Sequence, residues 1–165
     1  MTNRILSAGL VAAALLCAWP ALARVDVRYV QPERFSDSDM RSSGSRAGIM
    51  STFDRHFDKL GARYLKHNQT LRIDVLNIRL AGHTEPWQRQ FSNVRILRDS
   101  TPPRFRLRYT LTEGGRVLMQ GEETITDTAY LMHSARIGSG RYEHEKEMLR
   151  DWFRNRFVKL RPPRT

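Results

Sequence analysis

Cysteine is nearly absent from this chain of 165 residues, which contains only Cys17. A single cysteine excludes a disulfide-stabilised scaffold and a zinc site built from several thiolates. Acidic residues are also few, with 17 Asp and Glu against 28 Lys and Arg, so the formal net charge is +11. The length excludes a protein of several domains, and a charged fraction of 27% excludes a polytopic membrane protein.

The first 23 residues have the pattern of a secretory signal peptide. Arg4 provides a positive charge, residues 5–17 form an apolar run without a charge, and Ala21-Leu22-Ala23 offers the small-x-small site that a signal peptidase cleaves. The apolar run is shorter than the roughly 20 residues that span a bilayer, which argues against a transmembrane anchor. We therefore expect residues 1–23 to be removed and residues 24–165 to form a periplasmic protein.

The only cysteine lies inside this segment, so the cleaved protein would contain none. A lipoprotein signal would attach a lipid to Cys17, but it needs a small residue directly before the cysteine, and Leu16 occupies that position. Lipid anchoring at Cys17 is therefore disfavoured. Cleavage removes one basic residue and no acidic residue, so the mature chain stays strongly basic. Its length allows one hydrophobic core that needs no disulfide.

Hydropathy patterns after residue 24 predict two helices and about five strands. Alternation of apolar and polar residues marks the strands, and apolar residues at spacings of three and four mark the helices. In chain order, we expect a strand at 25–30, a helix at 49–64, strands at 71–80, 94–96, 105–111 and 117–126, and a helix at 142–160. The order β-α-β-β-β-β-α predicts a single α+β domain, with a mostly antiparallel sheet of about five strands and two amphipathic helices packed on one face.

Both predicted helices carry aromatic residues on their apolar stripes. Trp152 and Phe153 lie in the middle of the second stripe, so we expect them to pack against the sheet with Phe53 and Phe57 of the first helix. Gly61 interrupts the first helix and should weaken it by about 1 kcal/mol relative to alanine, unless it lets another part of the chain come close.

Two irregularities are predicted in the sheet. The apolar positions change parity at Val75–Leu76, and a strand can change parity only through an extra residue, so a β-bulge is expected there. Glu113-Gly114-Gly115 is interpreted as a three-residue hairpin loop. This loop keeps apolar residues on one face of the hairpin and places Glu122 opposite Arg106.

Five stretches of the chain together resemble one family of small exported proteins from Gram-negative bacteria. They cover nearly the whole mature chain, in order: VRYVQPERFSD at 27–37, DVLNIRLAG at 74–82, PPRFRLRY at 102–109, GEETITD at 121–127 with Tyr130-Leu131, and KEMLRDWF at 146–153. The family is known as a domain of unknown function, number three thousand and sixteen. The chain departs from the family pattern near Gly61, where alanine would be expected. The resemblance implies a signal peptide and one domain, and it brings neither an established activity nor a catalytic residue.

The mature chain contains no motif for a metal, a cofactor or a nucleophile. His144-Glu145 begins like the zinc motif H-E-x-x-H, but Met148 stands where the second histidine must be, so this segment is interpreted as a solvated helix start. Ser45 lies one position too early for the G-x-S-x-G nucleophile elbow. No glycine-rich loop lies between a strand and a helix to hold phosphate. We therefore expect no cofactor and no catalytic residue of these classes.

The candidate catalytic residues of the mature chain are carboxylates. Glu122, Glu123 and Asp127 lie within six positions, and Glu123 has the parity of the inward-facing side chains. A carboxylate on a buried face is more often part of a structural ion pair than a general base. An envelope hydrolase that uses Glu123, Asp127 and a nearby histidine remains the alternative function, because carboxylate pairs can assemble from distant segments.

Arginines on one face of the sheet are the strongest functional signal. Three of them alternate with apolar residues and project away from the core, and three others are expected on the same side by the parity of their strands. The candidate anion-binding face consists of Arg72, Arg79, Arg95, Arg104, Arg106 and Arg108. Guanidinium groups bind phosphates through paired donors. The competing interpretation is a solvated outer face with one cross-strand ion pair.

These features predict a non-enzymatic periplasmic binding or accessory module. The arginines would contact an anionic envelope component, such as lipopolysaccharide or an anionic phospholipid, or an acidic partner protein. Nucleic acid is a less suitable partner, because export removes most of it from reach. A structural or folding-helper role has the same sequence signature as the binding module.

Overall fold

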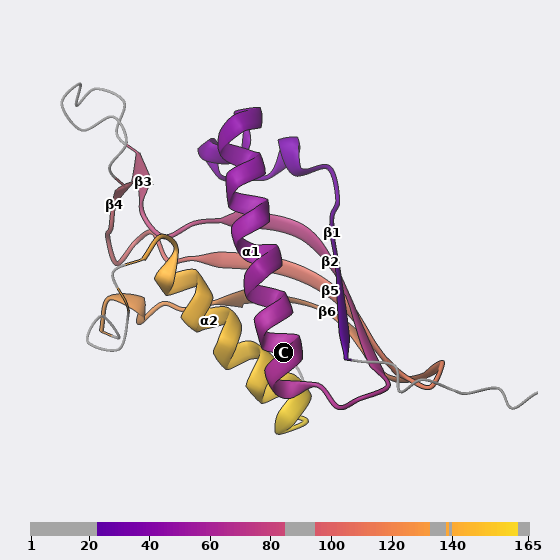
Figure 1. The fold of residues 1–165 in the computed structure, drawn as a ribbon. Coiled ribbons are helices and arrows are strands. Elements are labelled where there is room, and N and C mark those ends of the chain that lie inside the picture. The colour runs from indigo at the N-terminus through magenta and orange to yellow at the C-terminus, as the bar shows by residue number, and fades with distance from the viewer. Residues whose placement is uncertain (1–22, 85–94, 133–137, 139, 162–165) are drawn as a thin grey trace, which may run out of the picture.

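The computed structural model describes residues 23–84, 95–132, 138 and 140–161 (Figure 1). The predicted signal peptide lies outside the described residues, apart from Ala23, and so does the first residue of the strand predicted at 94–96. None of the described helices is long and apolar enough to cross a membrane.

A four-stranded sheet forms the centre of the molecule, in the order β1-β2-β5-β6. β1 pairs parallel to β2, whereas β2 with β5 and β5 with β6 are antiparallel. The strands are β1 (Arg24–Tyr29), β2 (Gln69–Arg79), β5 (Arg104–Glu113) and β6 (Arg116–Thr126). The predicted α+β class and single domain are confirmed, with one refinement: the main sheet is mixed, because a helix carries the chain from β1 back to the parallel β2.

Two helices cover one face of this sheet, as predicted (Figure 1). They are α1 (Ser43–Tyr64) and α2 (Glu143–Phe153), and α2 continues into a π-helical segment, Arg154–Val158. Two short 3-10 turns, Pro32–Arg34 and Ser38–Met40, precede α1.

The fifth predicted strand belongs to a separate ribbon. β3 (His83–Thr84) and β4 (Arg95–Ile96) pair with each other and not with the main sheet. The sequence pattern of a strand as short as β4 carries no information on which sheet it joins, because parity alone does not identify a partner strand.

Gly61 permits a close approach between α1 and β1. A Cβ atom at position 61 would overlap the side chain of Val25, so only glycine fits at this contact. The expected helix weakening at Gly61 is therefore accompanied by tighter packing of α1 on the edge strand.

The predicted bulge in β2 is confirmed. Its pairing with β5 shifts between Val75 and Asn77. Ile73 and Val75 are buried before the shift, and Ile78 is buried after it. The extra residue keeps apolar side chains on the core face along the whole strand.

The predicted hairpin register is wrong by two positions. Glu113 pairs with Arg116 across a two-residue turn, in which Gly114 and Gly115 have φ of 55° and 84°. Two consecutive left-handed residues match the twist of a hairpin better than the three-residue loop that was expected. A second register shift beside Leu111 then restores the apolar parity.

The hydrophobic core lies between the sheet and the helices. The ring of Trp152 packs edge-on against Tyr109 and Phe157, with centroids at 5.7 Å and 5.2 Å. Phe53 packs edge-on against Phe105 of β5 at 5.0 Å. Trp152, Phe153, Phe53 and Phe57 all belong to one buried cluster, which confirms the expected packing.

Candidate functional site

The face of the sheet opposite the helices carries exposed arginines. Arg104, Arg106 and Arg108 of β5 are exposed, and the residues between them are buried. We call the side of the sheet to which they project the open face. Arg72 and Arg79 of β2 also lie there, because they pair with residues of β5 that have the same parity.

Glu122 neutralises part of this charge. Its Oε1 accepts hydrogen bonds from Nε and Nη2 of Arg106 at 2.9 and 2.5 Å, and its Oε2 accepts from Nε and Nη2 of Arg108 at 3.0 and 2.8 Å. Hydrogen bonds from Arg108 and then Arg106 lower the pKa of Glu122. The expected contact with Arg106 is present, although Arg108 is the residue directly opposite Glu122.

Arg79 and Arg104 have no such partner. They lie directly opposite each other on β2 and β5. Within the described part of the chain, neither forms an ion pair, and Nε of Arg79 is buried without a hydrogen-bond partner. Like charges directly opposite on neighbouring strands are destabilising. An anion between the two guanidinium groups would remove this repulsion.

Arg95 does not lie on the open face, contrary to the prediction. It is in β4, where its Nη2 binds Asp37 at 3.0 Å and its Nη1 binds Asp39 at 2.7 Å. It also donates to the carbonyl oxygens of Ala81 and Gly82 at 3.0 and 2.6 Å. Arg95 thus ties the β3–β4 ribbon to the turn before α1. The parity argument failed because β4 is not part of the main sheet.

Glu123 forms the structural ion pair that its inward parity indicated. Arg156 donates to both of its carboxylate oxygens, and the indole N–H of Trp152 donates to Oε1 at 2.9 Å. Asp127 has a different role: its Oδ1 accepts the backbone N–H of Ala129 at 3.0 Å, in the turn after β6. Both carboxylates of the hydrolase hypothesis thus have structural contacts.

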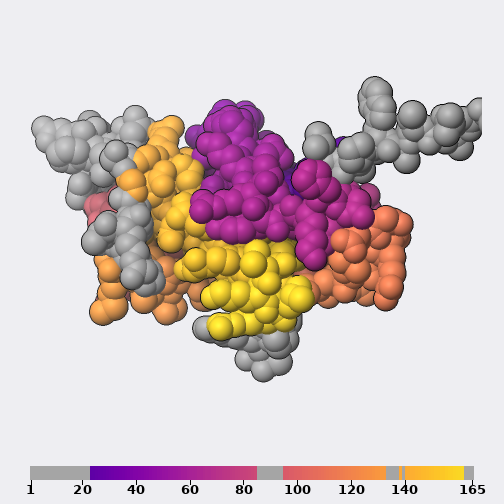
Figure 2. Space-filling view, turned by 60° about the horizontal axis from the view of Figure 1, so that its bottom comes forward, coloured from indigo at the N-terminus to yellow at the C-terminus, as the bar shows by residue number. Residues whose placement is uncertain are grey.

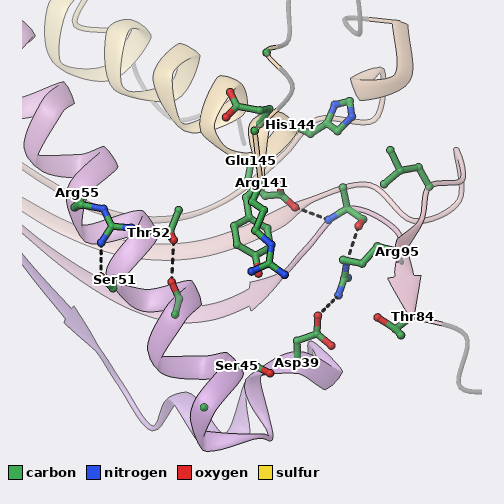
Figure 3. A pocket seen from close by; sticks show the side chains of 18 residues that line it. Asp39, Ser45, Ser51, Thr52, Arg55, Thr84, Arg95, Arg141, His144 and Glu145 are labelled. Carbon is green, nitrogen blue, oxygen red and sulfur yellow. Dashed lines mark hydrogen bonds and ion pairs between the residues drawn. The ribbon is translucent and has the colours of Figure 1, made fainter. Parts of the chain in front are cut away.

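A polar cleft of about 790 Å³ lies between α1, the β3–β4 ribbon and the start of α2 (Figure 3). Glu145 lines it and is only 2% exposed, and its Oε1 accepts the backbone N–H of Ala81 at 2.7 Å. Burial raises the pKa of Glu145. The interpretation of this segment as a solvated helix start was wrong for Glu145, because Ala81 becomes its neighbour only through the tertiary fold.

His144, beside Glu145, packs its ring edge-on against Tyr130 with centroids at 4.9 Å. Its Nδ1 is buried and has no hydrogen-bond partner among the described residues. In the same part of the chain, no three His, Cys, Asp or Glu side chains lie close enough together to hold a metal ion.

Comparison with known proteins identifies the family but no function. No curated protein and no solved structure matches the chain. One family matches residues 23–155, a range that contains the four strands of the sheet and both helices. The chain therefore belongs to the family described as "Protein of unknown function (DUF3016)".

Proposed function

We propose that this protein is exported to the periplasm and acts there as a non-enzymatic binding module for a phosphate-bearing envelope component. The open face is the binding surface, and its ligands are the phosphate groups of lipopolysaccharide or of anionic phospholipids. The observation that carries the proposal is the Arg79–Arg104 pair, which presents two guanidinium groups without a carboxylate among the described residues.

The charges around this pair are arranged in two dimensions. Seven arginines and three acids share the open face by strand register: Arg24, Arg28, Arg72, Arg79, Arg104, Arg106 and Arg108, with Asp26, Asp74 and Glu122. They are spread over neighbouring strands about 4.8 Å apart, so the excess positive charge forms a surface and not a line. A surface of this kind suits a planar array of phosphate headgroups.

The alternative function, an envelope hydrolase, has less support. Both oxygens of Glu123 accept hydrogen bonds from Arg156, Oε1 also accepts from the indole N–H of Trp152, and the side chain is only 10% exposed. A general acid or base needs a free lone pair or a transferable proton at the substrate. Glu123 is held by Arg156 and is largely buried, so a substrate has little access to it.

Binding to vesicles of anionic and neutral phospholipid, and to lipopolysaccharide, tests the proposal across a salt series. The variant R79Q/R104Q should lose at least about tenfold in affinity for anionic vesicles, because it removes the guanidinium pair. R79K/R104K should keep long-range attraction but lose affinity at moderate salt, since an ammonium group lacks the paired donors.

The matched control is R34Q/R41Q, which removes the same charge outside the strands of the sheet. It should bind anionic vesicles within about twofold of the wild type. If R79Q/R104Q and the control lost equal affinity for anionic vesicles, the net charge of the protein alone would explain the binding. Wild-type affinity in R79Q/R104Q would refute the proposed site. Selective binding of an acidic protein, with no binding to lipid, would mean that the open face binds a protein partner and not a membrane.

Export has its own test. Protein recovered from the periplasm should begin at Arg24 when its N-terminus is sequenced, because cleavage is expected after Ala23. A lipid-modified start at Cys17, or a cytoplasmic protein that keeps Met1, would contradict the proposed compartment.

A further inference from the structure

A basic groove runs between the two helices, on the side of the sheet opposite the open face. α1 and α2 lie side by side there, and Figure 2 shows the seam between them. The groove has a volume of about 380 Å³. Its charged lining residues are mostly basic: Arg55, Lys59, Arg63, Lys146 and Arg150, with Glu143 as the acid.

The basic residues of α1 form a line along the groove. Arg55, Lys59 and Arg63 are spaced four residues apart, so they lie on one side of the helix over about 12 Å. Arg55 donates to the hydroxyl groups of Ser51 and Thr52, and the guanidinium of Arg63 lies 5.4 Å from the ring centroid of Tyr64. Within the described residues, none of the three forms an ion pair with a carboxylate.

The wall formed by α2 is close to neutral. Lys146 binds Glu143 at 2.8 Å, and Arg150 binds Glu147. His56 lies between the helices, donates from Nε2 to the carbonyl oxygen of Lys146 at 2.9 Å, and has its pKa lowered to about 4, chiefly by burial. His56 is therefore neutral near pH 7, and the three basic residues of α1 supply the excess charge of the groove.

The groove continues into the polar cleft, because Arg55 and Thr52 line both hollows. Arg141 extends the line of positive charge at the Arg55 end (Figure 3). The acids that line the cleft already have partners of their own: Asp39 is paired with Arg95, Glu143 with Lys146, and the buried Glu145 accepts the backbone N–H of Ala81.

We propose that this groove is a second anion-binding site, which takes a linear chain of phosphate groups. Positive charges that repeat every ~6 Å along one helix match a chain, whereas the open face matches a planar array. Two of the three groups on α1 are guanidinium groups, whose paired donors bind phosphate oxygens bidentately. The inference does not rest on the proposed function, since the two surfaces lie on opposite sides of the sheet.

Two triple variants with equal changes of charge test the inference: R55Q/K59Q/R63Q in the groove, and the control R34Q/R41Q/R116Q at exposed arginines that do not line it. Binding of medium-length polyphosphate is measured by calorimetry across a salt series, with orthophosphate and polyglutamate as comparison probes. The groove variant should lose at least about tenfold in affinity for polyphosphate, and the slope of log affinity against log salt should fall by about 2, because three phosphate contacts disappear. The control variant should stay within about twofold of the wild type.

Circular dichroism and thermal unfolding establish that each variant folds, and R55K/R63K provides a milder change that keeps the charge. R55K/R63K should bind polyphosphate more weakly than the wild type at moderate salt. Equal losses in both triple variants, or equal affinity of the wild type for polyglutamate and polyphosphate, would overturn the inference. Absence of polyphosphate binding near 0.1 M salt would overturn it too. Vesicle binding by R79Q/R104Q reports separately on the open face.

Discussion

Glu123 and Arg156 form an ion pair that closes the core between β6 and the end of the second helix. Nε of Arg156 lies 2.8 Å from Oε1 of Glu123, and Nη2 lies 2.5 Å from Oε2. The side chains of Arg156 and Glu123 are only 7% and 10% exposed. Glu123 lies opposite the buried Leu107 on the core side of the sheet, and the indole N–H of Trp152 donates to it as well.

Removal of one partner should therefore be costly. Glu123→Gln leaves the guanidinium of Arg156 buried without its counter-charge, and it should lower the free energy of unfolding by about 3–5 kcal/mol. The double variant E123L/R156M should be less destabilised than E123L or R156M alone, because no uncompensated charge remains. Urea unfolding of the wild type and these four variants measures both effects. A single variant as stable as the wild type would mean that solvent reaches the pair.

Two glycines of the same helix should respond to alanine in opposite ways. Gly48 is exposed, and no atom lies within 4 Å of the place that a Cβ atom would take, so Gly48→Ala should stabilise the protein by about 1 kcal/mol. Gly61→Ala gains the same helix propensity but drives a methyl group into Val25, so it should destabilise the protein. In a Val25→Ala background, Gly61→Ala should become stabilising. Thermal unfolding compares the variants, and a stabilising Gly61→Ala alone would contradict the tight contact.

His56 should contribute to the loss of stability in acid. Burial and the neighbouring cations Arg150 and Lys146 lower its pKa to about 4, whereas the unfolded chain protonates a histidine near 6.5. Below about pH 6.5 the unfolded state binds this proton first, so stability is complete above that pH and is lost as the pH falls toward 4. Because part of the site is solvated, we expect a loss of about 2 kcal/mol.

The variant His56→Gln isolates this contribution. A glutamine amide can still donate to the carbonyl oxygen of Lys146, which His56 contacts at 2.9 Å, but it does not titrate. The difference in unfolding free energy between wild type and variant should change between pH 7 and pH 4 and stay constant above pH 7. A difference that is independent of pH over this range would show that His56 titrates alike in the folded and unfolded states.

The helices, the bulge at Val75 and the outward arginines of β5 could be predicted because each depends on a local period. Side chains alternate along a strand whatever the strand pairs with, so Arg104 and Arg108 had to face away from the buried residues between them. The inward parity of Glu123 likewise indicated a structural ion pair. The identity of its partner did not follow, because Arg156 lies 33 residues away in the chain.

The sequence alone determined the fold class, the exposed arginines of β5 and the family, since hydropathy periods and ordered motifs are properties of neighbouring residues. Only the tertiary structure decided where Arg95 lies, that Glu145 is buried, and that Arg79 faces Arg104 without a carboxylate. These depend on strand partners, on turn geometry and on the packing of α2 against the ribbon. Each is a contact between segments far apart in the sequence, so it forms only when the whole chain is packed.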